Sequence, residues 1–218
     1  MIPKQFEQST DIEIINRILN GDKPLYEIIV RRFNPYLYKI GRSYNFNHED
    51  TEDLMQDTYV HAFKGLSQFE HRSSFKTWII RIMINNCYRK KHKFSYKKEI
   101  INESVSENST PMFSNSNSDT QKEVQNRELG KVIETSLSKL PESFRIVFSL
   151  REITGLNIAE TASLLEISEA NVKVRLNRAK AILRTEIEKS YAPKELFEFN
   201  LCYCNPFTER VMGKINLL

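Results

Sequence analysis

Two short amphipathic segments within residues 157–184 constrain the fold more strongly than any other part of this chain. Apolar residues recur there at helical spacing, namely Ile158, Ala162, Leu165, Val172, Leu176, Ala179 and Leu183. Residues 166–168 leave room only for a sharp turn between the two segments. Asn157 and Ser168 can each precede a helix, because their side-chain oxygens can accept a hydrogen bond from a free backbone N–H. The pattern predicts two helices joined by a tight turn, as in a helix-turn-helix.

The second predicted helix has a surface that suits DNA. If its apolar residues face inward, small residues and one amide face outward with a cation on either side: Ala170, Val174, Asn177, Lys173 and Arg178. Amide and cationic side chains can bond base edges in the major groove, which the second helix of such motifs commonly enters. A helical hairpin with a basic, solvated face would show the same periodicity, so the pattern alone leaves both interpretations open.

Composition indicates a globular chain of one large or two small domains. It has 218 residues, 28% of them charged, and only 6 Gly and 7 Pro, which disfavours a loop-rich all-β fold. No apolar run is long enough to span a bilayer, and the amino terminus lacks the apolar core of a signal peptide, so we expect a cytoplasmic protein. Cys87, Cys202 and Cys204 form neither a disulfide framework nor a zinc pattern. We therefore expect no metal and no cofactor.

Charge is unevenly distributed along the chain. Residues 1–98 contain 17 Lys+Arg and 11 Asp+Glu, residues 99–125 contain 1 and 5, and residues 126–190 contain 11 and 9. Residues 95–125 also lose helical periodicity and are poor in large apolar groups, so they are predicted to form a flexible linker. Two basic modules on a tether are typical of a protein that binds a polyanion.

Four helices are predicted before the linker, over residues 10–20, 24–44, 49–68 and from 74 to the basic run at 89–93. Asp50 or Thr51 could cap the third. In the fourth, Arg81, Asn85 and Tyr88 form a stripe opposite the apolar face. A cation, an amide and an aromatic ring side by side could hold phosphate and unstacked bases, although a solvated surface would account for the same residues. The basic run favours phosphate contacts.

Clustered carboxylates in the third predicted helix do not indicate catalysis. Asp53 and Asp57 share a helix face, but no histidine, cysteine or glycine-rich loop completes a catalytic or metal site around them. Acidic residues near the start of a helix are common because they complement its dipole. The motifs of phosphate-binding loops, serine hydrolases and dinucleotide-binding folds do not occur in this sequence. We therefore expect a binding protein rather than an enzyme, with no small-molecule substrate.

Two blocks of the sequence resemble one family, in that family's order. Residues 50–86 resemble region two of the extracytoplasmic-function (ECF) class of bacterial RNA polymerase sigma factors, through E-D-L-x-Q-D, S-S-F-x-T-W and the Asn at 85. Residues 140–183, LPESFRIVFSLREITGLNIAETASLLEISEANVKVRLNRAKAIL, resemble region four. The resemblance implies an all-α fold with a region-two bundle at residues 1–94, a flexible linker at 95–125, a region-four helix-turn-helix at 126–190 and a C-terminal extension at 191–218.

The resemblance also implies what each surface binds. In this family region two contacts core polymerase and opens the minus-ten element, while region four reads the minus-thirty-five element. The implied polymerase-binding residues are Asp53, Gln56, Asp57 and Val60. The implied minus-ten residues are Phe69, Arg72, Ser73, Ser74, Arg81, Asn85, Tyr88 and Arg89. The implied minus-thirty-five residues are Arg151, Asn171, Lys173, Val174, Asn177 and Arg178.

The implied function is that of a sigma factor, which directs core RNA polymerase to promoters and promotes DNA melting. Core polymerase, promoter DNA and an anti-sigma factor are the expected partners. A helix-turn-helix regulator that binds duplex DNA without sigma activity is the alternative. The chain departs from the family at Glu166, where the turn usually has glycine, so this residue must avoid a positive φ or tolerate strain. Val174 replaces a residue that is more often serine, which would exchange a hydrogen bond for contact with a thymine methyl group.

Overall fold

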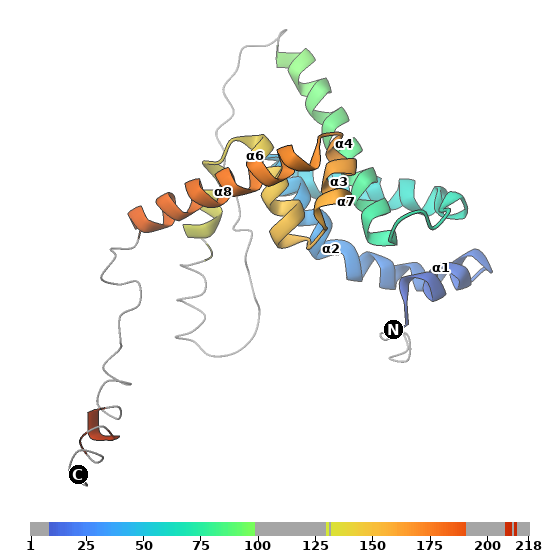
Figure 1. Ribbon diagram of the computed structural model, residues 1–218. Coiled ribbons are helices and arrows are strands. Elements are labelled where there is room, and N and C mark those ends of the chain that lie inside the picture. The colour runs from blue at the N-terminus through green and yellow to red at the C-terminus, as the bar shows by residue number, and fades with distance from the viewer. Residues whose placement is uncertain (1–8, 99–129, 131, 191–207, 211, 213–218) are drawn as a thin grey trace.

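All regular elements in the described part of the protein are helices. The computed structural model describes residues 9–98, 130, 132–190, 208–210 and 212, and Figure 1 shows their arrangement. One group of helices precedes the segment 99–129 and a second group follows it. This confirms the predicted all-α fold of two helical domains.

The first domain consists of four α-helices. They are α1 (Asp11–Leu19), α2 (Tyr26–Ser43), α3 (His48–Lys64) and α4 (Phe75–Lys98), with 3₁₀ turns at Lys23–Leu25 and Leu66–Gln68. α1 begins with a capping box, in which the Thr10 hydroxyl accepts from the N–H of Glu13 and the Glu13 carboxylate accepts from the N–H of Thr10. Pro24 occupies the first turn before α2, as predicted, and α2 continues through Pro35.

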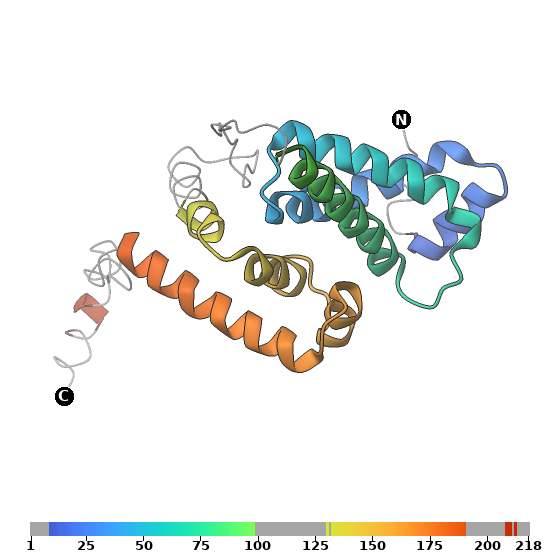
Figure 2. The same cartoon turned by 90° about the horizontal axis from the view of Figure 1, so that it is seen from above.

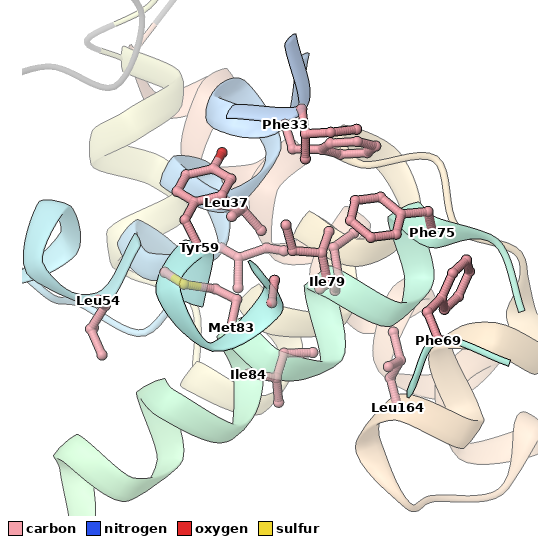
Figure 3. Close-up of a cluster of buried hydrophobic side chains, with 14 of the residues drawn as sticks. Phe33, Leu37, Leu54, Tyr59, Phe69, Phe75, Ile79, Met83, Ile84 and Leu164 are labelled. Carbon is pink, nitrogen blue, oxygen red and sulfur yellow. The ribbon is translucent and has the colours of Figure 1, made fainter. Parts of the chain in front are cut away.

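Side chains from α2, α3 and α4 fill the core of this domain, as Figure 3 shows. Leu37, Ile79 and Met83 are completely buried, and burying each such side chain contributes about 1.5–3 kcal/mol. Two buried polar side chains of this core are paired with each other: the hydroxyl of Thr58 donates to a backbone carbonyl and accepts from the Asn86 amide at 3.0 Å. The core therefore holds the three helices at fixed spacing, with no cost from unpaired polar groups at that point.

The second domain contains the predicted helix-turn-helix. A helical segment at residues 132–138 precedes α6 (Glu142–Phe148), a π-helical turn η4 (Ser149–Ile153), α7 (Ile158–Leu165) and α8 (Glu169–Ser190). The backbone N–H of Thr154 donates to the carbonyl of Ser149 at 2.9 Å, which closes the wider turn. Gly155 then stops the segment at φ +71°, as predicted. Four buried residues form the core of the motif: Val147, Ala162, Val172 and Leu176.

Three predicted boundaries differ from the structure. α3 is capped by Asn47, whose side-chain oxygen accepts from the N–H of Asp50 at 2.7 Å, rather than by Asp50 or Thr51. It ends at Lys64, and a separate 3₁₀ turn follows. α4 continues to Lys98, into the first residues of the predicted linker. The rest of that linker and most of the C-terminal extension, with Cys202 and Cys204, lie outside the described residues.

The two domains share one apolar interface. Four residues of the second domain belong to the main core cluster of the first: Ile146, Leu150, Leu156 and Leu164. Figure 3 shows Leu164 of α7 beside α4, near Phe69. Figure 2 shows that α8 lies on the side of the second domain that faces away from the first. We call this arrangement the closed form.

A buried arginine links the domains at the other end of this interface. Arg145 is 3% exposed, and its Nε donates to the carbonyl of Ser43, at the end of α2, at 2.7 Å. One terminal nitrogen donates to the carbonyls of Ser138 and Leu140, each at 3.1 Å. The guanidinium thus joins the end of α2 to the break that precedes α6. Two ion pairs join the same surfaces, Arg42–Glu134 and Lys91–Glu142.

Candidate nucleic-acid interface

The turn of the helix-turn-helix depends on one residue in the left-handed conformation. Glu166 has φ +54° and ψ +41°, and its N–H donates to the carbonyl of Ala162. Ile167 donates to the same carbonyl at 3.1 Å. Of the two alternatives that the sequence left open, the structure shows a strained backbone, which costs about 1–2 kcal/mol for a residue with a β-carbon.

Side-chain caps fix the start of both helices of the motif. The Asn157 side-chain oxygen accepts from the N–H of Glu160 at 2.8 Å, and the Glu160 carboxylate accepts from the N–H of Asn157 at 2.8 Å. The Ser168 hydroxyl accepts from the N–H of Asn171 at 3.2 Å. The predicted caps at Asn157 and Ser168 are therefore confirmed.

The outer face of α8 is exposed, whereas its predicted apolar face is buried. The buried residues are Val172, Leu176, Ala179 and Leu183, and the exposed ones are Lys173, Val174, Asn177 and Arg178. Asn171 differs, because it is only partly exposed and its side-chain oxygen accepts from Arg175 Nε at 2.9 Å. The structure therefore brings four of the predicted minus-thirty-five residues together on one accessible surface.

Arg151 lies apart from that surface. It belongs to the π-helical turn, is partly buried, and donates from its guanidinium to the carbonyl of Leu156. This contact supports the turn that leads into α7. Contact between Arg151 and the DNA backbone stays a prediction.

α4 presents the predicted stripe of Arg81, Asn85 and Tyr88 on an exposed face, together with Arg89. Tyr88 is 61% exposed, and its ring centroid lies 4.2 Å from that of His92, one turn further along the helix. An exposed ring held in place by a second ring suits stacking on an unpaired base. The sequence prediction missed His92, although its spacing of four residues from Tyr88 was an available signal.

The loop before α4 does not present all of its predicted residues. Phe69 is only 7% exposed, and its ring centroid lies 5.4 Å from that of Phe75 and 5.2 Å from that of Trp78. In the closed form Phe69 is thus a support beneath the loop rather than a contact surface. His71, which the sequence prediction missed, has φ +56°, an exposed side chain and a ring 4.6 Å from that of Phe69. Histidine is enriched at positive φ, but too weakly for prediction from one sequence.

The other predicted loop residues are exposed. Arg72 forms an ion pair with Glu70 at 2.5 Å, and the hydroxyl of the exposed Ser73 donates to the carbonyl of Ser74 at 3.3 Å. The Ser74 hydroxyl accepts from the N–H of Thr77 at 3.1 Å, so Ser74 also caps α4. The cap places this residue at the point where the loop meets the stripe of α4.

The polar face of α3 is exposed in the closed form. It consists of Asp53, Gln56, Asp57 and Val60. A hollow of about 510 Å³ lies between this face and the basic end of α4, and charged residues of both signs line it: Asp53, Asp57, Arg89, Lys90 and Lys93. Alternating charge at an open surface favours recognition of a charged partner by complementarity.

The second domain contacts the amino-terminal end of α4. Arg81 donates to the Ser163 hydroxyl at 3.1 Å, and the Thr77 hydroxyl donates to the Glu160 carboxylate at 2.9 Å. Lys76 Nζ donates to the carbonyl of Thr154. Burial at this contact lowers the pKa of Lys76, partly offset by the Glu160 charge. At one end of the α4 stripe, Arg81 therefore forms a hydrogen bond to the second domain. At the other end, Asn85 and Tyr88 are exposed to solvent.

The described part of the chain has neither a candidate metal site nor an exposed cysteine. It contains no group of three or more His, Cys, Asp or Glu residues that could hold a metal ion. Cys87 is buried, which raises the pKa of its thiol to about 12, so the thiol stays protonated and unreactive at neutral pH. No helix among the described residues is long and apolar enough to cross a membrane.

Comparison with known families assigns both domains. The Sigma-70 region 2 family model matches residues 29–93, and the Sigma-70, region 4 model matches residues 131–183. The first match covers α4 with its exposed stripe, and the second covers the helix-turn-helix. Together they span more than half of the chain.

Similar proteins agree with this assignment. The ECF RNA polymerase sigma-E factor of Haemophilus influenzae is 23% identical over 185 residues, which are 84% of this chain and 97% of the relative. The factor of the same description from Escherichia coli K12 is 24% identical over 189 residues, 84% of this chain and 96% of the relative.

Two solved structures have the same fold. CnrH in complex with the cytosolic domain of CnrY gives a TM-score of 0.57 at 23% identity, over 83% of this chain and 99% of that one. The sigma factor RpoE in complex with the anti-sigma factor NepR from Bartonella quintana gives 0.59 at 22% identity, over 75% of this chain and 96% of that one.

Region two and region four, in this order and with exposed polar faces on both, define a bacterial transcription initiation factor of the sigma-70 type. The chain belongs to the ECF class of this family. It is therefore a sigma factor, which directs RNA polymerase to promoters.

Proposed function

We propose that three exposed surfaces divide the work of this sigma factor. The outer face of α8 reads the minus-thirty-five element as duplex DNA. The stripe on α4, with the exposed part of the loop before it, captures the melted minus-ten strand. The polar face of α3 binds core polymerase. The main support is that most of the side chains assigned to each surface are exposed, while the apolar residues on the opposite faces of α3, α4 and α8 are buried in the cores.

Capture of a base explains how a protein without catalytic groups opens DNA. Unstacking a base costs a few kcal/mol, and stacking on Tyr88 with hydrogen bonds from Asn85 and Arg81 would offset this cost. His71 and His92, whose rings lie on those of Phe69 and Tyr88, would extend the stacking surface. The residues bind and orient the strand, and polymerase performs the chemistry.

Transcription by reconstituted polymerase tests this function. Core polymerase from the source organism, this chain and fragmented genomic DNA should give transcripts that start at a shared promoter sequence. A regulator without sigma activity would shift duplex DNA by itself and direct no initiation. Failure to initiate with active core enzyme would reject the proposal.

Replacing Lys173 or Arg178 by alanine should weaken binding to the minus-thirty-five duplex. Each contact is worth about 1–3 kcal/mol if it reads a base, which is a loss of about 5-fold to 150-fold in affinity. Fluorescence anisotropy with a labelled promoter duplex measures the change. Lys189→Ala, at the far end of α8, is the control, since Lys189 is paired with Glu186. Unchanged affinity in both test variants would mean that another face reads DNA.

Asn85→Ala should impair open-complex formation and leave binding of core polymerase intact. Loss of a base-reading amide costs about 1–3 kcal/mol, so the fraction of open promoter should fall about tenfold, as measured by permanganate reactivity of unpaired thymines. Asn16→Ala removes an exposed amide from α1 and is the matched control. Weaker binding of core polymerase by Asn85→Ala would contradict the assignment of this face.

The proposal extends to partners and location. A solved structure of similar fold contains an anti-sigma factor, and this supports an anti-sigma factor as a partner of this chain too. Because core polymerase and promoter DNA are the other partners, the protein would act in the cytoplasm. It would do so as a binding subunit and not as an enzyme.

A further inference from the structure

Arg175, on the second turn of α8, is oriented by a neutral side chain. Its Nε donates to the side-chain oxygen of Asn171, one turn earlier, at 2.9 Å. The Ser168 hydroxyl accepts from the backbone N–H of Asn171 at 3.2 Å, so the helix cap fixes the backbone that carries this oxygen. Both Asn171 and Arg175 are partly exposed. The guanidinium is therefore held in one direction while solvent can still reach it.

Two other helical arginines are held through Nε in the same way, but by carboxylates. Arg31 donates to Glu27 at 2.7 Å, and Arg184 donates to Glu188 at 2.8 Å. A carboxylate orients an arginine and also neutralises its charge, whereas an amide only orients it. Arg175 keeps its full positive charge, and its terminal nitrogens have no partner among the described residues. Two such nitrogens in one plane suit an anion with two oxygens, such as a phosphate.

Arg175 lies at the edge of the exposed face of α8. The residue before it, Val174, is exposed, and the residue after it, Leu176, is buried. Arg178, about one turn further on, is exposed along the same edge. A helix in the major groove presents the centre of its outer face to the bases, and side chains at its edges lie near the phosphates that border the groove. Arg175 is therefore placed for a phosphate rather than for a base.

We propose that Arg175 binds a phosphate of the minus-thirty-five duplex, and that Asn171 is its positioning residue rather than a reader of bases. This inference rests on the proposed function of the outer face of α8. An asparagine that reads adenine uses its side-chain oxygen and nitrogen together, and here the oxygen is taken by Arg175. A phosphate held at this edge fixes the register of α8 in the groove, and so determines which bases Lys173 and Asn177 reach.

Arg175→Gln tests the phosphate contact, because it removes the charge and keeps most of the side chain. The full chain is titrated by fluorescence anisotropy with a labelled duplex that was selected for affinity to the chain from a random pool. Affinity should fall about tenfold. Between about 50 and 200 mM salt, the further loss of affinity should be about threefold smaller than for the unmodified chain, because one phosphate contact fewer releases counterions. Arg184→Gln is the matched control, since Glu188 neutralises Arg184, and should change neither quantity.

Arg175→Lys is the rescue variant, because it keeps the charge and should keep the salt dependence of the unmodified chain. A salt dependence unchanged by Arg175→Gln, or reduced as much by Arg175→Lys, would overturn the phosphate contact. So would a change of preference at a single base pair, which would indicate that Arg175 reads a base.

A double-mutant cycle tests the role of Asn171. Asn171→Ala should lower affinity about threefold in the unmodified chain and have no effect beside Arg175→Gln, because a positioning residue acts only through the group that it positions. An equal loss in both backgrounds would show that Asn171 contacts DNA itself, and would overturn the positioning role. Failure of the proposed function would be seen separately, as unchanged affinity in both Lys173→Ala and Arg178→Ala.

Discussion

Arg145→Ala is expected to lower the free energy of unfolding by about 3–5 kcal/mol. Removing the buried, charged guanidinium would leave three buried backbone carbonyls without a hydrogen-bond donor. Those carbonyls belong to Ser43, Ser138 and Leu140. The substitution removes hydrogen bonds within the second domain and one between the domains. The second domain and the interface between the domains should therefore both be less stable. Urea unfolding followed by circular dichroism measures the loss.

Arg184→Ala is the control for this change. Arg184 forms an exposed pair with Glu188 on α8, and such pairs contribute at most about 1 kcal/mol. Arg145→Lys keeps the charge but cannot reach all three carbonyls, so its effect should lie between the two. A loss no larger for Arg145→Ala than for Arg184→Ala would show that the buried hydrogen bonds do not stabilise the protein.

A second large effect, on the binding of core polymerase, is expected from charge reversal on α3. Asp53→Lys with Asp57→Lys should weaken binding of core polymerase more than about 100-fold, since reversing charge at a complementary interface costs several kcal/mol. Binding can be measured by competition with a labelled sigma factor. Affinity of the second domain for minus-thirty-five duplex should stay unchanged, because α8 lies on the other side of the molecule from α3 (Figure 2).

A matched charge change elsewhere separates a specific surface from net charge. Asp22→Lys with Glu27→Lys alters net charge equally, at two exposed carboxylates near the start of α2. Asp53→Asn with Asp57→Asn removes the charges without placing new cations beside Arg89 and Lys93, and should give an intermediate loss. Equal loss of polymerase affinity in the Asp22 and Glu27 variant would reject α3 as the binding face.

Local signals in the sequence predicted much of the second domain. The helix-turn-helix, its caps at Asn157 and Ser168, and the buried face of α8 follow from periodicity and capping chemistry, which act over a few residues. Near His48 the same reasoning chose the wrong cap, since Asn47, Asp50 and Thr51 are all capable of the role and only the packing of α3 selects Asn47. The π-helical turn at Ser149–Ile153 has no short-range signature of this kind.

Contacts between distant residues could not be predicted in this way. An arginine in a helix is ordinarily expected at the surface, yet Arg145 is buried because its partner carbonyl, that of Ser43, lies 102 positions away in sequence. Phe69, whose contact with DNA stays a prediction, is buried against Phe75 and Trp78 in the closed form, and periodicity gave no sign of these ring contacts. The closed form itself depends on such pairs, so the sequence left the arrangement of the two domains open.

The apolar part of the interface between the domains has a thermal consequence. Opening would expose Ile146, Leu150, Leu156 and Leu164 to water, and hydration of apolar surface raises heat capacity. The free energy of opening must therefore curve with temperature, with a maximum at an intermediate value and a decline on cooling as well as on heating. The fraction of molecules in which the two domains are separated then depends on temperature as well as on binding partners.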